Sequence, residues 1–121
     1  MSKRDPETAL RQILSHAQEA VDLCHHKTRA DLDSDRLLNL ALTRLIEVIG
    51  EAANRVPLHV QEQHSHLPWL QMISACNRLI HGYDSVDFDI LWNIVKQDLP
   101  GVIHELEDIL KDSQDKSNTG V

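Results

Sequence analysis

The sequence predicts an all-helical protein with one domain. Its 121 residues include only four glycines and four prolines, and aromatic residues make up 3% of the chain. No run shows the alternation of apolar and polar residues, rich in Val, Thr and aromatics, that is typical of strands. Apolar residues recur instead three and four positions apart, which is the period of an amphipathic helix. A chain of this length can bury one core and is too short for two.

The first helix is expected from residue 6 to about residue 27. Asp5 is suited to cap it, Pro6 to occupy its first position, and Glu7 to interact favourably with the helix dipole. Its apolar face is formed by Leu10, Ile13, Leu14, Ala17, Ala20, Val21 and Cys24.

A mostly polar connection at residues 28–34 leads to a second helix, which Asp33 or Ser34 is expected to cap and which ends near Arg55 before Pro57. Its apolar residues cover more than one face: Leu37, Leu38, Ala41, Leu42, Leu45, Ile46, Val48, Ile49, Ala52 and Ala53. This width favours a helix with neighbours on two sides, or one that enters a dimer interface.

A short helix or turn is expected at residues 58–64, and Leu67-Pro68-Trp69 then opens a third long helix. Gly82 is the natural C-terminal cap of that helix.

The last part of the chain predicts two more helical segments. Residues 87–97 form the first, with Asp87 as its N-cap, and Pro100 starts or kinks the second. The helical domain is therefore expected to span residues 1–112. Residues 113–121 are almost devoid of apolar side chains and predict a disordered C-terminal tail.

Composition limits the classes of function. A net charge of −7 and a pI near 5.5 argue against binding nucleic acid through a broadly basic surface, so an RNA site would be local. Five arginines are available for such a site: Arg29, Arg36, Arg44, Arg55 and Arg78. No apolar run approaches the about 20 residues that span a bilayer. With two cysteines, Cys24 and Cys76, and no signal peptide, the expected location is cytoplasmic, with free thiols.

The segment from Cys76 to Asp84 reads Cys-Asn-Arg-Leu-Ile-His-Gly-Tyr-Asp and contains the most reactive combination of side chains in the chain. On a helix with about 100° per residue, Asn77, Arg78 and His81 share a polar stripe with Ser74. Opposite this stripe lies an apolar arc of Trp69, Met72, Ile73, Cys76, Leu79, Ile80 and Tyr83.

These side chains suit cleavage of RNA without a metal. A neutral His81 can take the proton from a ribose 2′-hydroxyl, and Arg78 can stabilise charge on the phosphorus in the transition state. The plain structural interpretation is a solvated helix face, with His81 binding the last carbonyl groups of its helix. Cys76 is interpreted as a buried small residue rather than a catalytic thiol.

Other candidates have simpler explanations. The histidines at 59, 64 and 66 lack a recognised set of metal ligands, so no metal site is predicted, and no cofactor either. Glu47 and Glu51 are expected to pair with Arg44 or Arg55 on a solvated face. Trp69 and Trp92 are expected in the core.

The chain resembles the HepT-like toxins of the HEPN ribonuclease superfamily (DUF86 type), over roughly residues 5 to 110. The resemblance rests on Leu45–Ala52, Pro68-Trp69, Asn77–Tyr83, Val86-Asp87, Trp92 and Asp98-Leu99-Pro100. The family motif is Arg, four residues, His, one residue, Tyr, and His81 and Tyr83 stand in its register. The position of the motif arginine holds Cys76.

The resemblance implies an up-and-down bundle of four to five helices that forms a homodimer. It also implies the toxin of a type II HEPN/MNT toxin-antitoxin system, a metal-independent endoribonuclease that cleaves RNA by attack of the 2′-hydroxyl. Its partner would be an MNT-type nucleotidyltransferase antitoxin. Tyr83 would contact RNA or, as the resemblance implies, accept AMP from that antitoxin. His81, Asn77 and Arg78 would form the catalytic site.

Cys76 has two open explanations: a naturally weakened member of the family, or an inactivated copy of a toxic gene. Losing one preorganised donor costs on the order of 10²–10³ in rate, so Arg78 would have to substitute. The alternative function is a non-catalytic helical dimer that only binds the nucleotidyltransferase.

Overall fold

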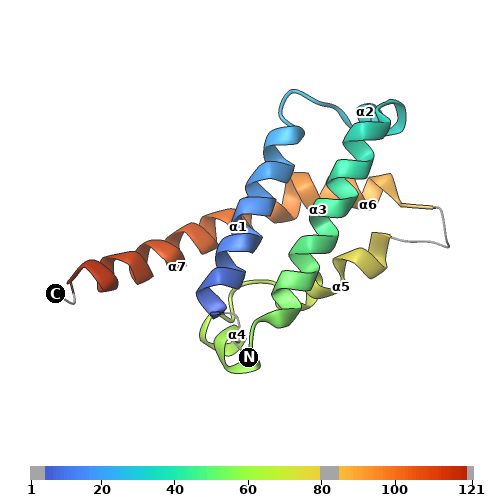
Figure 1. Cartoon of the computed structure of the whole chain (residues 1–121). Coiled ribbons are helices and arrows are strands. Elements are labelled where there is room, and N and C mark those ends of the chain that lie inside the picture. The colour runs from blue at the N-terminus through green and yellow to red at the C-terminus, as the bar shows by residue number, and fades with distance from the viewer. Residues whose placement is uncertain (1–4, 80–84, 120–121) are drawn as a thin grey trace.

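Every secondary-structure element within the described residues is a helix, which confirms the all-α class. A computed structural model of the chain describes residues 5–79 and 85–119, and side chains for the same residues except Cys76 and 113–119. The elements are α1 (Pro6–Leu23), α2 (Arg29–Ser34), α3 (Arg36–Arg55), α4 (Leu58–Gln63), α5 (Trp69–Leu79), α6 (Phe88–Asn93), the π-helix η1 (Ile94–Asp98) and α7 (Leu99–Thr119). Figure 1 shows α1 and α3 side by side and antiparallel.

The start of α1 follows the sequence signals, and its end comes earlier than expected. The Asp5 carboxylate accepts a hydrogen bond from the Glu7 N–H at 3.1 Å, as the cap prediction requires. The helix stops at Leu23 rather than near residue 27, because the backbone turns into the left-handed region at His26, with φ 65°. The Lys96 ammonium group, from η1, donates to the Cys24 carbonyl oxygen at 3.3 Å and so satisfies a group at the helix end.

The connection after α1 was predicted as non-helical, and this is wrong: it contains the six-residue helix α2. Thr28 and Asp31 stabilise its start, with the Thr28 N–H donating to the Asp31 carboxylate at 2.6 Å. The next helix, α3, is capped by Asp35 rather than by Asp33 or Ser34, since the Asp35 carboxylate accepts from the Leu38 N–H at 3.1 Å.

Two side chains hold α2 in place. Asn39, the polar residue most deeply buried among those described, donates from its amide to the Leu32 carbonyl oxygen at 2.9 Å. Arg29 donates to Asp89 of α6 at 2.7 Å and lies 3.1 Å from the Asp33 carboxylate. These carboxylates, Asp89 foremost, raise the pKa of the Arg29 guanidinium above its ordinary value. The contact between Arg29 and Asp89 joins segments that are 60 residues apart in the sequence.

The central helix is α3, which packs against α1, α2, α5 and α6. Neighbours on several sides account for the wide apolar face that the sequence showed. Its buried residues are Leu38, Asn39, Leu42, Leu45, Ile46, Ile49, Gly50, Ala52 and Ala53. At Gly50 the backbone of α5 comes close to α3, since a Cβ atom built there would lie 3.0 Å from the Met72 carbonyl oxygen.

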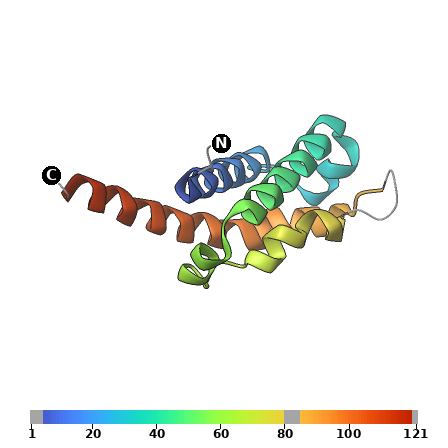
Figure 2. The ribbon, with the colours of Figure 1, turned by 60° about the horizontal axis from the view of Figure 1, so that its bottom comes forward.

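α6, η1 and α7 follow one another without a break and form the long helical rod of Figure 2. The Asp87 carboxylate caps the start as predicted, accepting from the N–H groups of Asp89 and Ile90. Within η1 the Leu99 N–H bonds to the Ile94 carbonyl oxygen, five residues back. Pro100 lacks an N–H group and would crowd the carbonyl four residues earlier in a regular α-helix, which explains the wider turn before it.

The far end of α7 reaches past α1 and carries the C-terminal end away from the other helices (Figure 1). Its backbone is helical through Thr119, whereas the sequence predicts a disordered tail from Ser113. Extending an existing helix adds one hydrogen bond per residue without a new nucleation cost, which accounts for helix in so polar a segment.

The number of elements exceeds the four or five helices expected. The described residues form seven α-helices and one π-helix, because α2 and α4 are six-residue additions and the last rod is divided by η1. None of the helices in this part of the chain combines the length and apolar character needed to cross a membrane.

Gly50 and Gly101 form a matched pair for testing the contact between α3 and α5. We expect Gly50→Ala to destabilise the protein by about 1–3 kcal/mol through overpacking against Met72. Gly101→Ala meets nothing within 4 Å and should stabilise it by up to about 1 kcal/mol through helix propensity. Urea unfolding of both variants measures the difference in their free energies of unfolding. Equal stabilisation by both substitutions would show that α5 can shift away from Gly50 at little cost.

Candidate functional site

The predicted site residues fall partly within the described structure. Asn77 and Arg78 lie in the last turn of α5, and both are exposed. Cys76 belongs to the same turn, and its side chain is not described. His81 and Tyr83 lie outside the described residues, as does the predicted cap Gly82.

The buried and the exposed residues of α5 lie on the two faces that the helical period predicts. Trp69, Met72 and Leu79 of the predicted arc are buried, and Ile73 is half-buried. The buried face also includes Ala75, which the sequence analysis left out because a small residue adds little to an apolar pattern. On the polar side, the Ser74 hydroxyl donates to the Leu70 carbonyl oxygen at 2.6 Å, so this side chain is held within its own helix.

A backbone hydrogen bond joins Leu79 and Asp87, the two ends of the segment that contains His81 and Tyr83, called the motif segment below. The Asp87 N–H donates to the Leu79 carbonyl oxygen at 2.8 Å. Leu79 is fully buried, and Asp87 is the N-cap of α6. The residues on both sides of His81 and Tyr83 are therefore fixed to the core, whatever path the segment between them takes.

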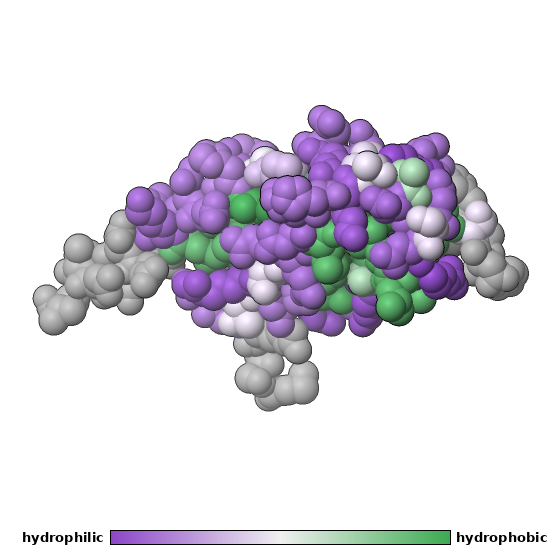
Figure 3. Space-filling model, turned by 90° about the horizontal axis from the view of Figure 1, so that it is seen from above, coloured by the Kyte–Doolittle hydropathy of each residue, from purple (hydrophilic) through white to green (hydrophobic). Residues whose placement is uncertain are grey.

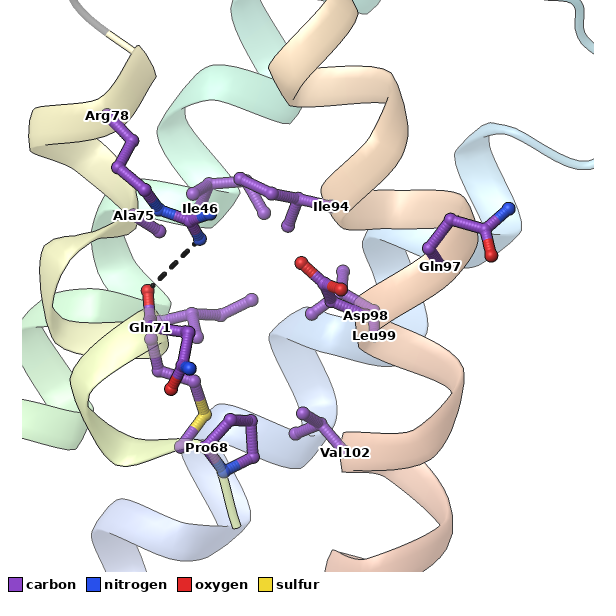
Figure 4. A pocket seen from close by; sticks show the side chains of 12 residues that line it. Ile46, Pro68, Gln71, Ala75, Arg78, Ile94, Gln97, Asp98, Leu99 and Val102 are labelled. Carbon is purple, nitrogen blue, oxygen red and sulfur yellow. Dashed lines mark hydrogen bonds between the residues drawn. The ribbon is translucent and has the colours of Figure 1, made fainter.

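Arg78 lies at the edge of a pocket that no pattern in the sequence predicted. The pocket has a volume of about 290 Å³ and lies between α3, α5 and the junction of η1 with α7 (Figure 4). Its walls are mostly apolar and buried, with Ile46 and Ile49 from α3, Met72 and Ala75 from α5, and Leu99 and Val102 from α7. A guanidinium N–H of Arg78 donates to the Gln71 carbonyl oxygen at 3.3 Å, which folds the side chain back along α5.

Asp98 lies on the wall opposite Arg78. Figure 4 shows the Asp98 carboxylate and the Arg78 guanidinium directed into the same space, with Gln71 on the side of Arg78 and Gln97 on the side of Asp98. A positive group and a negative group thus face each other across an apolar interior, while the Gln97 amide points away from it in the same view. The only signal for this in the sequence was Asp98-Leu99-Pro100, whose proline disturbs the helix that carries Asp98.

The arginines considered for an RNA cleft are divided among different places. Arg29 faces the carboxylates of Asp33 and Asp89, and Arg44 lies 3.7 Å from Glu47 and 3.6 Å from Glu51. Arg44 and Arg36 line a second hollow of about 490 Å³, which Val86 and Phe88 also border. That hollow and the Arg78 pocket are lined by different residues, so the expectation of one arginine-lined cleft is not met within a single chain.

Two of the histidines considered as metal ligands, His64 and His66, lie in the turn before α5. The His66 imidazole lies 2.8 Å from the Glu105 carboxylate, which connects the turn before α5 to α7. Burial, with a contribution from His66, lowers the pKa of His64 below its ordinary value. In the part of the chain that the structure describes, no three His, Cys, Asp or Glu side chains are grouped to hold a metal ion.

The face of the molecule in Figure 3 is mainly polar, with apolar side chains visible in separate patches. The large apolar residues with the greatest exposure among those described are Leu37, Leu40, Leu58 and Leu70. They belong to α3, α4 and α5. Two of the helices that line the pocket therefore also present leucines to solvent.

Comparison with known proteins places these features in a family. The family model described as "Ribonuclease HepT-like" matches residues 9–109. "Putative RNase MJ0125" of Methanocaldococcus jannaschii is 30% identical over 116 residues, 96% of this chain and all of the relative. "Putative RNase MJ1380" of the same organism is 33% identical over 88% of this chain and 98% of its own length. "Probable ribonuclease HepT" of Thermococcus cleftensis is 32% identical over 84% of this chain and 96% of its own. No solved structure matches the chain.

The exposure of Asn77 and Arg78 predicts that neither supports the fold. Asn77→Ala and Arg78→Ala should each change the free energy of unfolding by no more than about 0.5 kcal/mol. Leu79→Ala, at a fully buried neighbouring position, should cost about 2–5 kcal/mol. Denaturant unfolding of the three variants tests this. A loss of stability in Arg78→Ala comparable to that in Leu79→Ala would assign Arg78 a structural role.

Proposed function

Because this chain belongs to the HepT-like ribonuclease family, we propose that it cleaves RNA and that its catalytic groups are those at and after the end of α5. The observation that carries the proposal is the position of Asn77 and Arg78. Both are exposed in the last turn of α5, and Arg78 is three residues before His81 in the sequence. The backbone bond between Leu79 and Asp87 holds the two ends of the motif segment against the core.

The proposed reaction needs a base, a charge-stabilising group and no metal. His81 takes the proton from the ribose 2′-hydroxyl, and the oxygen attacks the adjacent phosphorus. The bond from phosphorus to the 5′-oxygen breaks, the protonated His81 or a water protonates that oxygen, and a 2′,3′-cyclic phosphate remains. Arg78 stabilises the added negative charge on the phosphoryl oxygens, and Asn77 donates a hydrogen bond to them.

Cys76 bears on how fast this reaction runs. A thiol at the motif arginine position supplies no positive charge, so Arg78 is the described cation of α5 closest in sequence to His81. Its guanidinium now donates to the Gln71 carbonyl oxygen and would have to leave that acceptor to reach a phosphate. The exposed side chain can make this change at little cost, but the loss of one preorganised donor predicts a slow enzyme.

A homodimer is the proposed working form. Leu37 and Leu70 are 80% and 79% exposed on α3 and α5, and a second copy of the chain would remove this apolar surface from water. Pairing two copies would also bring together groups that a single chain keeps apart. A monomeric mass at micromolar concentration in analytical ultracentrifugation would exclude this form.

The proposed biological role is the toxin of a type II toxin-antitoxin pair in the cytoplasm. An MNT-type nucleotidyltransferase would neutralise it by attaching AMP to Tyr83. The Tyr83 hydroxyl oxygen would attack the α-phosphorus of ATP, lose its proton and displace pyrophosphate. A bulky phosphodiester two residues from His81 would then repel the RNA backbone.

A second candidate function follows from the same cysteine. If the lack of the motif arginine abolishes cleavage, the chain remains a helical dimer that binds the nucleotidyltransferase. A ribonuclease assay separates these functions, because the binding module would cleave nothing at any concentration.

Restoring the arginine tests the catalytic assignment. We expect Cys76→Arg to increase the rate of RNA cleavage on the order of 10²-fold, measured in a chelator with a labelled oligonucleotide. His81→Ala in the Cys76→Arg background should abolish the gain, and the product should carry a 2′,3′-cyclic phosphate. Cys76→Lys is the matched control, since it adds charge without the planar guanidinium. Equal rates for the unaltered chain and Cys76→Arg, at equal folding, would remove position 76 from the site.

The acceptor of AMP can be identified independently of cleavage. With a cognate nucleotidyltransferase and ATP, we expect one AMP on each chain, and none in Tyr83→Phe. We expect the modified protein to keep its melting temperature, because the buried residues of α1, α3 and α7 are not themselves modified. Labelling that persists in Tyr83→Phe would place the acceptor elsewhere in the chain.

A further inference from the structure

We propose that the pocket between α3, α5 and the junction of η1 with α7 binds a guanine base of the RNA and so selects the site of cleavage. The proposal rests on the proposed ribonuclease function and adds a specificity to it. Three features carry it: an apolar interior of base size, a carboxylate on one wall, and a guanidinium on the other wall that belongs to the candidate catalytic helix.

The size and lining of the pocket fit a small, flat and largely apolar group. Its volume of about 290 Å³ is just below the range of about 300–1,000 Å³ for sites of drug-sized ligands, so the pocket suits a single base better than an extended ligand. Ile49, Met72 and Val102 offer aliphatic surfaces for the faces of the ring. Recognition of single-stranded RNA commonly inserts unstacked bases between such surfaces and reads their edges with polar groups.

Asp98 selects among the four bases. An ionised carboxylate only accepts hydrogen bonds, through two oxygens side by side. Guanine presents two adjacent donors, N1–H and the 2-amino group, which match these oxygens. Adenine and cytosine each place an unprotonated ring nitrogen beside their amino group, and uracil places carbonyl oxygens on both sides of its N3–H. Each of these three bases would turn an acceptor toward the carboxylate, so guanine binds best.

Arg78 connects the pocket to the proposed reaction. Its guanidinium is on the α5 wall, facing Asp98 across the pocket in Figure 4, while its backbone is in the turn that leads to His81. A base held against Asp98 would therefore place its own sugar and phosphate beside Arg78. The guanidinium can exchange the neutral Gln71 carbonyl for a phosphate oxygen, which is the stronger acceptor because it is charged.

The π-helical turn places Asp98 on this wall. In η1 the Leu99 N–H reaches back five residues instead of four, so the rod contains one extra residue at this point. One residue corresponds to about 100° of rotation, which changes the direction of the side chains around the junction relative to a continuous α-helix. The irregular turn and the lining of the pocket by Ile94, Gln97 and Asp98 thus coincide.

Binding of nucleotides tests the pocket without requiring cleavage. We expect guanosine 3′-monophosphate to bind the full chain at least about tenfold more tightly than the adenosine, cytidine and uridine 3′-monophosphates, measured by calorimetric titration in a chelator. Asp98→Asn replaces one acceptor with a donor and should remove this preference. Asp108→Asn, the same change ten residues along the rod and away from the pocket, should retain it.

A second variant tests the location. Ala75→Leu fills the pocket from α5 and should weaken binding of all four nucleotides, with a melting curve to establish that the variant is folded.

Three results would each overturn the proposal: equal affinity for the four nucleotides in the unaltered chain, no binding at millimolar concentration, or a guanine preference that survives in Asp98→Asn. Cleavage that continues with the same base preference in Asp98→Asn would overturn it while leaving the ribonuclease function intact. Guanine-selective binding by a chain that cleaves no RNA would support the pocket and count against the ribonuclease function.

Discussion

The close approach of α5 to α3 is the contact on which the position of the candidate site depends. A Cβ atom at Gly50 would lie 3.0 Å from the Met72 carbonyl oxygen, so glycine allows the two backbones to come this near. Met72 and Ala75 then pack against α3, and Asn77 and Arg78 face outward by the helical period. The same contact brings Ile46 and Ile49 into the pocket wall. One small residue on the central helix thus allows the close packing of α3 and α5 that brings residues of both helices into one pocket wall.

The fold could be predicted from the sequence wherever local rules and burial agree. The apolar period identified the long helices, Asp5 and Asp87 were found as caps, and Pro57 marked the end of α3. The prediction failed where several residues compete for one role. Asp33, Ser34 and Asp35 were all suitable caps, and Asp35 takes the position while Asp33 turns to Arg29. That choice depends on contacts between α2 and α6, which no local pattern reveals.

The candidate site, like the fold, could be predicted from the sequence only in part. Exposure of Asn77 and Arg78 followed from the period of α5, because an amphipathic helix turns its polar side outward. The pocket could not be predicted, since its walls come from three helices and its carboxylate from a π turn. Pro100 signals that the helix must adjust, but the position and direction of the adjustment depend on how the rod packs against α1 and α5. His81 and Tyr83 remain predictions from the motif alone.

The net charge of −7 is compatible with an RNA site because the acidic residues already neutralise most of the arginines whose contacts the structure describes. Arg29 faces two carboxylates, and Arg44 lies near two more. Arg78 differs from them, because the acceptor of its hydrogen bond is the neutral Gln71 carbonyl oxygen. Its charge is therefore not cancelled by that bond. Asp98 faces Arg78 across the pocket, but no ion pair joins these two described residues, so a phosphate would gain more from Arg78 than from Arg29 or Arg44. The acidic surface would repel the RNA backbone elsewhere, so affinity would be concentrated at the end of α5, where the chain places its motif.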